Sequence, residues 1–234
     1  GAGAEAAALD VRDAGAFDAA VAAAMERHGR LDYLFNNAGT GVGGEAKDYT
    51  LDDWRYVVEV NLMGVIHGVQ AAYPRMIRQG FGHLVNVASV AGWLPSPFTT
   101  VYGTTKHAVV GLSRSLGLEA RPHGVRVSVV CPGVIRTPIL VGGGRHGRVK
   151  LDVPVESQRA YWEPLRPMDP DLFAAKVLAR VARGQAMIIE PAWWRLMWWL
   201  NGLSPGLADW IAYRRYVRTK AELEAAARGA PRSQ

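Results

Sequence analysis

The sequence predicts an α/β fold with a doubly wound, mostly parallel sheet. Short apolar segments alternate with longer segments whose apolar residues recur at helical spacing, and several apolar segments end in small or polar residues. The predicted strands are residues 31–35, 82–89, 125–130 and 186–189. The predicted helices are residues 13–27, 50–73, 102–119 and 171–183. In an open sheet of this kind, ligands bind at the carboxyl ends of the strands.

The limits of each element follow from local signals. A short strand is expected to end at residues 7–11, and the helix at residues 13–27 ends at Gly29. The helix at residues 50–73 begins with a capping box in which Asp53 is the acidic member. Asn61 lies inside that helix among apolar neighbours, where asparagine is unfavourable, which suggests a purposeful local distortion.

Length and composition fit one globular domain in a reducing compartment. The chain has 234 residues, of which 49% are hydrophobic and 21% are charged. Its single cysteine, Cys131, excludes an internal disulfide, and its place at the end of an apolar strand favours a buried, inert thiol. Residues 1–8 do not resemble a signal peptide, so a cytoplasmic protein is expected.

The net charge of +6 has two interpretations. A basic protein can bind nucleic acid or an anionic surface. We favour a solvated surface together with a phosphate-bearing cofactor, because the sequence contains no Walker loop and no nucleic-acid motif. No zinc-ligand spacing is present either, and no metal site is predicted.

Three side chains form the predicted centre of the site. Ser89 follows the strand at residues 82–89, and Tyr102 lies 13 residues further along. Tyr102 and Lys106 are four residues apart, so on a helix they share one face. A cation beside a phenol lowers its pKa, and a phenol tuned in this way can act as a general acid or base. The Tyr-x-x-x-Lys pattern alone is weak; the strand and spacing before it give it weight.

These motifs together resemble the short-chain dehydrogenase/reductase family. The resemblance rests on Ser89, Tyr102 and Lys106, on Asn36-Asn37-Ala38-Gly39 after one strand, and on Cys131-Pro132-Gly133 after another. It covers residues 5–140 and a late strand near 186–190. It implies a Rossmann-like fold and a catalytic set of Asn61, Ser89, Tyr102 and Lys106, in which Asn61 holds a water that links Lys106 to solvent. The cofactor-binding residues that it implies are Asp10, Val11, Asn37, Ala38, Gly39, Tyr102, Lys106, Pro132, Gly133 and Thr137.

The glycine-rich segment after the first predicted strand needs a separate interpretation. Gly39, Gly41 and Gly44 satisfy the G-x-G-x-x-G spacing of a dinucleotide-binding turn. The next helix begins near Thr50 and not at the last glycine, so we interpret this segment as a loop on the substrate side.

In the family, a βαβ segment with a glycine-rich turn precedes the residues matched here. We expect that portion to be missing, which leaves the strand at residues 31–35 with an exposed edge. The residue that selects NAD or NADP lies in that segment, so either cofactor is expected. A fragment of a full enzyme, or a mis-called gene start, is favoured over a genuinely shortened relative, because the catalytic set is intact.

A change in composition near residue 190 divides the chain into two predicted parts. Residues 1–190 are expected to form the truncated Rossmann-type dehydrogenase domain, with residues 141–170 as a proline-interrupted substrate loop. Residues 191–234 form a C-terminal extension whose segment 191–218 is rich in tryptophan and arginine. That segment predicts either peripheral membrane contact, or a substrate cover or subunit contact. Residues 220–234 are expected to be a frayed tail.

The predicted function is a hydride-transfer oxidoreductase. Its substrate is expected to be an apolar alcohol or ketone, because of Trp93, Phe98 and the tryptophan-rich segment near the C-terminus. Trp93, Leu94 and Phe98 are expected to line the pocket, with ordinary core packing as the alternative. Homodimers or homotetramers, formed through the helices at residues 50–73 and 102–119, are implied by the resemblance. The alternative is a non-catalytic relative that acts as a binding module or at a membrane surface.

Overall fold

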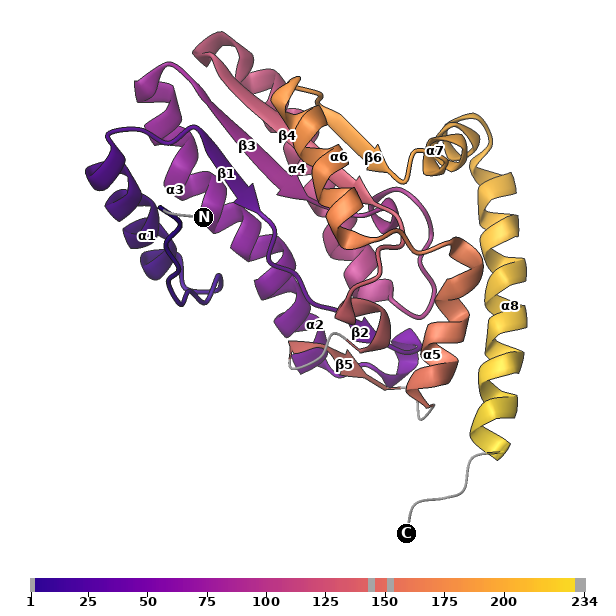
Figure 1. Cartoon of the computed structure of the whole chain (residues 1–234). Coiled ribbons are helices and arrows are strands. Elements are labelled where there is room, and N and C mark those ends of the chain that lie inside the picture. Colours follow the sequence, from indigo (N-terminus) through magenta and orange to yellow (C-terminus); the bar gives the residue numbers. More distant parts are fainter. Residues whose placement is uncertain (1–2, 143–145, 151–153, 230–234) are drawn as a thin grey trace.

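A parallel four-stranded sheet forms the centre of the protein. The computed structural model describes residues 3–142, 146–150 and 154–229. The strands are β1 (Tyr33–Asn36), β3 (Gly82–Val87), β4 (Val125–Pro132) and β6 (Met187–Glu190). They are parallel in the order β1-β3-β4-β6, as Figure 1 shows. The predicted α/β fold with a parallel sheet is therefore confirmed, and the strands predicted at residues 31–35, 82–89, 125–130 and 186–189 are present within a few residues of their expected limits.

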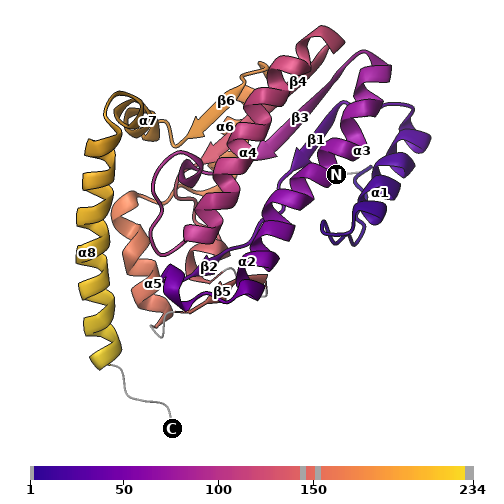
Figure 2. The ribbon, with the colours of Figure 1, turned by 180° about the vertical axis from the view of Figure 1, so that it is seen from behind.

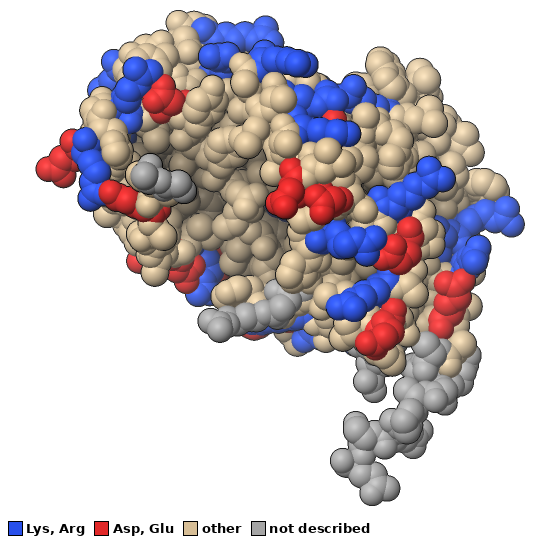
Figure 3. Space-filling model, viewed as in Figure 1, with Lys and Arg blue, Asp and Glu red and all other residues tan. Residues whose placement is uncertain are grey.

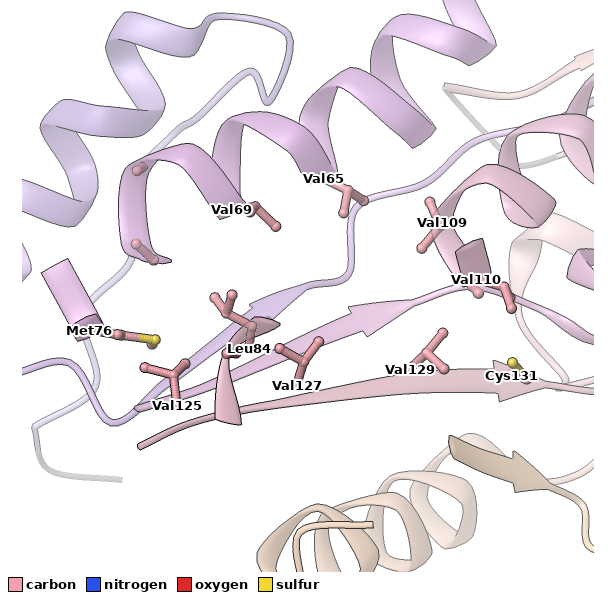
Figure 4. Packing of buried hydrophobic residues seen from close by; sticks show 14 of the residues in the cluster. Val65, Val69, Met76, Leu84, Val109, Val110, Val125, Val127, Val129 and Cys131 are labelled. Carbon is pink, nitrogen blue, oxygen red and sulfur yellow. The ribbon is translucent and has the colours of Figure 1, made fainter. Parts of the chain in front are cut away.

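Helices cover the two faces of this sheet unequally. Helices α3 (Gly64–Gln79) and α4 (Thr100–Glu119) cover one face, and α1 (Ala14–His28) packs against α3 (Figure 2). Between these helices and the sheet lies the main core, in which Val65, Val69 and Met76 of α3 meet Leu84 and the valines of β4 (Figure 4). On the other face, α6 (Pro170–Ala182) packs against β6 and buries Val177 and Val181.

The outer edge of the sheet is open at β1. This strand pairs with β3 on one side, and no described residue pairs with its other side. Tyr33 and Phe35 of β1 are exposed, and a hollow of uncharged surface lies between α1 and α6 over this edge (Figure 3). The strand expected at residues 7–11 is not formed: residues 7–10 have no regular secondary structure, and Val11 lies in a turn.

The helix predicted over residues 50–73 is longer and less regular than expected. It comprises α2 (Leu51–Val58), a π-helical turn (Glu59–Met63) and α3, which continues through Pro74 to Gln79. Packing on the sheet outweighs the local cost of Pro74. Gly80 ends the helix in the left-handed conformation, with φ of 79°.

A small second sheet joins two distant segments. Strand β2 (Val42–Gly43) pairs with β5 (Arg148–Val149). Buried Asp53 completes the predicted capping box of α2 and also pairs with Arg148 and Lys150 at 2.9 and 2.8 Å. Burial would raise the pKa of this carboxyl, but Lys150, the Thr50 amide and Arg148 outweigh burial and hold it well below its usual range. The basic residues of the predicted substrate loop therefore fasten that loop to α2.

The C-terminal part of the chain is helical. Helix α5 (Val155–Trp162) lies within the predicted substrate loop, and α7 (Trp194–Leu203) and α8 (Pro205–Gly229) follow β6. The expectation of a frayed tail is wrong for residues 220–229, which continue α8. Lys220 of α8 pairs with Glu45 at 2.6 Å, and Tyr216 also bonds Glu45, so contacts with the rest of the fold hold this helix. Residues 230–234 lie outside the described residues. Short 3₁₀ turns complete the structure at Ala46–Asp48, Val90–Gly92, Arg121–His123, Pro138–Val141 and Glu163–Leu165.

A buried histidine in β3 predicts how stability depends on pH. The ring of His83 bonds Ser128 of β4 at 2.7 Å, and burial, assisted by the charge of Arg126, lowers its pKa from 6.5 to about 4. Between these values the unfolded chain binds a proton that the folded chain does not. Stability is therefore full above pH 6.5 and is lost as the pH falls toward 4, by about 2–3 kcal/mol.

Urea unfolding at several pH values tests this prediction on the unmodified protein and on His83→Leu. The substitution should flatten the dependence between pH 4 and 6.5, because it removes the titrating group. His123→Gln, which changes an exposed histidine, is the control. An unchanged slope in His83→Leu would contradict the prediction.

Candidate active site

Ser89 lies where β3 ends. Its hydroxyl accepts a hydrogen bond from the Ala91 amide at 3.1 Å and donates to the Pro132 carbonyl at 3.4 Å. The first bond caps the short 3₁₀ turn that follows β3, and the second ties Ser89 to the end of β4. The side chain is therefore fixed between the carboxyl ends of two adjacent strands, as expected for a ligand site in a parallel sheet.

Tyr102 and Lys106 lie in the first turns of α4, on the side that faces this strand end. The Lys106 ammonium lies 5.5 Å from the centre of the Tyr102 ring and donates to the Val87 carbonyl at 2.8 Å. Lys106 is almost completely buried, whereas Tyr102 is half-buried. The sequence-based placement of both side chains on one helix face with Ser89 nearby is thus found in the structure.

The ionisation of this pair differs from the sequence-based expectation. Burial raises the pKa of the Tyr102 phenol above 10, and a hydrogen bond with Ser89 opposes part of that rise. Burial also lowers the pKa of Lys106 from 10.5 to about 8. The predicted lowering of the Tyr102 pKa is therefore wrong: the ammonium is directed at the Val87 carbonyl, and burial has the larger effect on the phenol.

Asn61 lies at the π-helical turn and is completely buried. Its side-chain oxygen accepts from the Thr40 amide at 2.8 Å, and its nitrogen donates to the Thr40 carbonyl at 2.9 Å and to Thr105 at 3.2 Å. The predicted local distortion is present as the π turn, a feature common at functional sites. Asn61 thereby holds the loop after β1 against the helix that carries Lys106.

The Asn36–Gly39 motif divides into a structural and an exposed part. The Asn36 amide donates to Asn86 of β3 at 2.8 Å and so ties the end of β1 to the neighbouring strand. Asn37, Ala38 and Gly39 are exposed at the carboxyl end of β1. A Cβ added to Gly39 would lie 3.5 Å from Lys106 Nζ, so this loop passes directly beside the buried ammonium.

Asp10 and Val11 occupy different surroundings. Asp10 is exposed and pairs with Arg12 at 2.6 Å, whose hydrogen bonds lower its pKa to about 2. Val11 faces inward, and its carbonyl oxygen lies 2.9 Å from Nδ1 of His67 on α3. Val11, Asn37 and Ala38 line one open, mostly apolar cavity of about 310 Å³ along β1. The contact between Val11 and His67 joins residues 56 positions apart, so no local sequence pattern could have predicted it.

Pro132, the last residue of β4, lines a second, larger cavity together with Gly133 and Thr137, which follow the strand. The Gly133 amide donates to the Glu190 carbonyl at 2.8 Å. A Cβ at Gly133 would lie only 2.1 Å from the indole nitrogen of Trp194, so glycine is required by close packing of α7 on this turn. Cys131, directly before this turn, is buried, and burial raises its pKa to about 12, as expected for an inert thiol.

The larger cavity has a volume of about 890 Å³ and contains the proposed catalytic side chains on one wall. Ser89, Tyr102 and Lys106 line it together with the exposed loop residues Asn37 and Gly39. Helices α5, α7 and α8 supply the opposite walls, which are mostly apolar. Leu94 and Phe98 line the cavity as predicted, but Trp93 belongs to the core.

Residues 141–170, expected to form a substrate loop, and residues 191–218, for which a substrate cover was one alternative, both contribute walls to the cavity through α5 and α8. The individual wall residues were not predicted: they include Tyr161 and Trp162 of α5 and Arg215 of α8. The spacing of apolar residues along α5 and α8 would be the same for a cavity wall as for ordinary helix packing, so the sequence could not distinguish the two. The division of the chain at residue 190 stays a prediction, and both sides of that division contribute to this cavity.

The glycine-rich loop does not lead into a phosphate-binding helix. Gly41 precedes β2, and α2 begins at Leu51, seven residues after Gly44. Gly39, Gly41 and Gly43 line the larger cavity. The interpretation as a loop of the cavity, and not as a dinucleotide fingerprint, agrees with this geometry.

The exposed loop ends could hold an extended cofactor. Asn37 lines both cavities, so the open groove beside β1 and the larger cavity meet at this residue. The backbone at Asn37–Gly39 carries only a small side chain, Ala38, and no side chain at Gly39, which allows a planar group to approach Lys106 closely. Asn37, Ala38 and Gly39 would thus leave room for an extended cofactor to lie along this loop.

Comparison with known proteins gives consistent matches. The family model for short chain dehydrogenases matches residues 1–143. The oxidoreductase UcpA of Escherichia coli O157:H7 is 35% identical over 178 residues, which cover 76% of this chain and 68% of UcpA. The trans-4-hydroxycyclohexanecarboxylate dehydrogenase of Sinomonas cyclohexanicum is 38% identical over 151 residues, covering 64% of this chain and 58% of that enzyme.

A solved structure agrees with these matches. The short chain dehydrogenase/reductase of Burkholderia phymatum in complex with NAD is 31% identical, with a TM-score of 0.76 over 88% of this chain and 78% of its own. The family-model match over residues 1–143 includes the ends of β1, β3 and β4 and the helix that carries Tyr102 and Lys106. On the family model, the sequence matches and the shared fold, this chain belongs to the short-chain dehydrogenase family of oxidoreductases.

Proposed function

We propose that this protein is an NAD- or NADP-dependent oxidoreductase that interconverts an apolar alcohol and the corresponding ketone, with Tyr102 as the general acid and base. The observation that carries the proposal is that Ser89, Tyr102 and Lys106 line one mostly apolar cavity of about 890 Å³. A phenol, a hydroxyl and an ammonium converge there on a space large enough for a substrate and part of a cofactor.

Each polar group has a defined task in this proposal. In the reducing direction Tyr102 donates its proton to the carbonyl oxygen, and the raised pKa of the phenol means that this proton is present at neutral pH. Ser89, held by the Ala91 amide and the Pro132 carbonyl, hydrogen-bonds the same oxygen and stabilises the charge that develops on it. Lys106 supplies a positive charge beside the phenol and a donor to the cofactor ribose. Asn61 positions the loop beside Lys106, and a water held near it would connect Lys106 to solvent.

The bound nicotinamide would supply the chemistry of hydride transfer. The residues proposed to hold the cofactor are Asp10, Val11, Asn37, Ala38, Gly39, Tyr102, Lys106, Pro132, Gly133 and Thr137. Of these, Val11 and Ala38 line the open groove, Asn37 joins the two cavities, and Asp10 would have to leave Arg12 to contact an adenine. NAD and NADP both remain in the proposal, since one neighbour of known structure contains NAD and another contains NADP.

An apolar substrate is proposed from the cavity walls. Leu94, Phe98, Trp162, Trp194 and Met197 line the space opposite Tyr102. One relative, as its name states, acts on a hydroxylated cyclohexane ring, which is a secondary alcohol on an apolar body. Homo-oligomers formed through the helices at residues 50–73 and 102–119 stay part of the proposal, as does the alternative of a non-catalytic binding module.

A second candidate function is contact with an anionic membrane surface through residues 191–218. Among the described residues, no helix is long and apolar enough to cross a bilayer. Trp199, Leu203 and Trp210 are nevertheless 60%, 82% and 53% exposed on α7 and α8. Four arginines accompany Asp209 in this segment, giving it a net positive charge. Exposed tryptophan and leucine beside arginine is typical of interfacial helices.

Replacement of Tyr102 by phenylalanine tests the main proposal. NADH- and NADPH-dependent reduction of cyclic ketones should fall about 100-fold or more, because the proton donor is lost. Cofactor binding, measured by fluorescence titration of the full chain, should remain in the micromolar range. Tyr33→Phe removes a hydroxyl from the exposed face of β1 and should leave turnover unchanged. Substantial residual turnover in Tyr102→Phe would refute the assigned role.

Burial of Lys106 gives a prediction about stability and pH. The folded-state pKa of about 8 lies below the unfolded value of 10.5, so the unfolded chain binds more protons between these values. Below pH 8 the buried charge destabilises the fold, and the penalty is relieved as the pH rises to 10.5. Lys106→Met should therefore be more stable than the unmodified protein at neutral pH, by at most about 3.5 kcal/mol, and should lose this advantage near pH 10.5.

Thermal unfolding at neutral pH and at high pH measures the difference. Lys176→Met, which replaces an exposed lysine on α6, controls for the change of residue type and should show no comparable gain. A Lys106→Met variant that is less stable at every pH would contradict the prediction.

Vesicle co-sedimentation tests the membrane candidate. The unmodified protein should pellet with phosphatidylglycerol vesicles and less with phosphatidylcholine vesicles. Replacing Trp199 and Trp210 together by serine should weaken this binding about tenfold or more, because two large aromatic groups no longer enter the interface. The control pair, Leu172→Ser and Leu178→Ser, changes exposed residues of α6. Equal pelleting of both double variants, or pelleting of neither the unmodified protein nor the variants, would count against a membrane role.

A further inference from the structure

The large cavity is lined by positively charged side chains. Among the described residues that line it, the charged side chains are Lys106, Arg148 and Arg215, and none is an aspartate or glutamate. Two of these cations already have hydrogen-bond or ion-pair partners. Lys106 donates to Val87 beside Tyr102, and Arg148 pairs with Asp52 and Asp53 at 2.6 and 2.9 Å.

Arg215 differs from the other two cations. Its guanidinium donates to the Tyr161 carbonyl at 3.2 Å and lies 4.8 Å from the centre of the Tyr161 ring. Among the described residues, no carboxylate pairs with it. The side chain is half-buried, and a guanidinium has five donor hydrogens, so most of its hydrogen-bonding capacity is uncommitted.

The guanidinium is held in place by aromatic packing. Tyr161 contacts Trp162 edge to face at 4.6 Å, and the Trp162 indole donates to the Leu140 carbonyl at 2.8 Å. Tyr161, Trp162 and Arg215 all line the cavity. A guanidinium stacked on an aromatic ring is weakly hydrated and keeps its planar fork available for a carboxylate. Arg215 is thus oriented before any ligand binds, at a wall formed by α5 and α8.

We propose that Arg215 binds a carboxylate on the substrate, so that the substrate class is apolar hydroxy acids and oxo acids, whose acid group lies away from the reacting carbon. The part of this proposal that concerns oxidation or reduction of the substrate rests on the proposed oxidoreductase function. Binding of the carboxylate by Arg215 does not depend on that function. Ser89 and Tyr102 would receive the alcohol or ketone oxygen, the apolar walls would enclose the carbon skeleton, and Arg215 would fix the opposite end.

The first test compares two ligands that differ in charge. Cyclohexanecarboxylate and cyclohexanecarboxamide have nearly the same shape, and their binding to the full 234-residue chain can be followed by calorimetry and by the fluorescence of Trp162 and Trp194. The carboxylate should bind on the order of 10- to 100-fold more tightly, which is the usual difference for a charge-assisted hydrogen bond. Equal binding of both ligands would overturn the proposal without any variant being needed.

The second test assigns the preference to one arginine. Arg215→Gln should bring the carboxylate to the affinity of the carboxamide, and Arg215→Lys should keep part of the preference. The neighbouring Arg214 is exposed and lies 4.9 Å from the Trp210 ring on the outer surface, so Arg214→Gln is the matched control and should bind both ligands as the unmodified protein does. An equal loss in Arg214→Gln and Arg215→Gln would refute a specific role for Arg215.

The third test separates this proposal from the proposed function. Tyr102→Phe should retain the full preference for cyclohexanecarboxylate, since Arg215 is unaltered. With NADH or NADPH, the unmodified protein should reduce 4-oxocyclohexanecarboxylate with a lower KM than the corresponding amide, and Arg215→Gln should remove that difference. A retained binding preference without reduction of either ketone would refute the oxidoreductase function and support the carboxylate site. Reduction of both ketones with the same KM would refute the carboxylate site alone.

Discussion

The ammonium group of Lys106 donates to the Val87 carbonyl at 2.8 Å, at the carboxyl end of β3, where almost no solvent reaches it. Within the described residues no carboxylate pairs with this charge. A buried cation without a counter-ion is unfavourable, which is reflected in a pKa lowered to about 8. Burial of the Lys106 ammonium is therefore costly, and several parts of the chain that lie far apart in the sequence surround this charge.

The arrangement around Lys106 begins in a distant helix. The π turn at Glu59–Met63 places Asn61 against the backbone of Thr40, which it bonds through both its oxygen and its nitrogen. These bonds hold the loop so close that a Cβ added to Gly39 would lie 3.5 Å from the Lys106 ammonium and 3.6 Å from the Asn61 side-chain oxygen. A regular α-helix would direct residue 61 differently, because each inserted residue rotates the side chains about the axis. The irregularity and the buried charge are thus parts of one arrangement.

The sequence predicted this half of the molecule well because its signals are local. Strand ends, the capping box at Thr50–Asp53 and the spacing between Tyr102 and Lys106 depend on neighbours within a few residues, and the structure contains all of them. The predicted pKa of Tyr102 had the wrong direction because spacing reports proximity to a charge but not burial. The strand expected at residues 7–11 could not be judged from sequence, since a strand depends on a pairing partner that local pattern does not reveal.

The cavity walls show the complementary limit of sequence reasoning. Helix α8 was expected to fray after residue 220, yet Lys220 and Tyr216 both contact Glu45, which lies 175 and 171 residues away in the chain. Its Arg215 faces the cavity while the adjacent Arg214 stacks on exposed Trp210, so consecutive residues of one type serve opposite faces. Only the tertiary position of the helix distinguishes them. Contacts between residues so far apart in the chain leave no repeat or spacing pattern in a single sequence.

The residues proposed for proton transfer and those proposed for substrate selection lie on different elements of the fold. The groups proposed to move protons lie on the strand ends and on α4, where the sheet fixes their positions. The groups proposed to select the substrate lie on α5 and α8, which contact the rest of the molecule through the turn after β4, Glu45 and one another. A substitution at Tyr161 or Arg215 changes no bond that holds Ser89, Tyr102 or Lys106. Substrate preference can therefore change through these two helices while the reaction itself is preserved, which is how one scaffold accommodates many substrates.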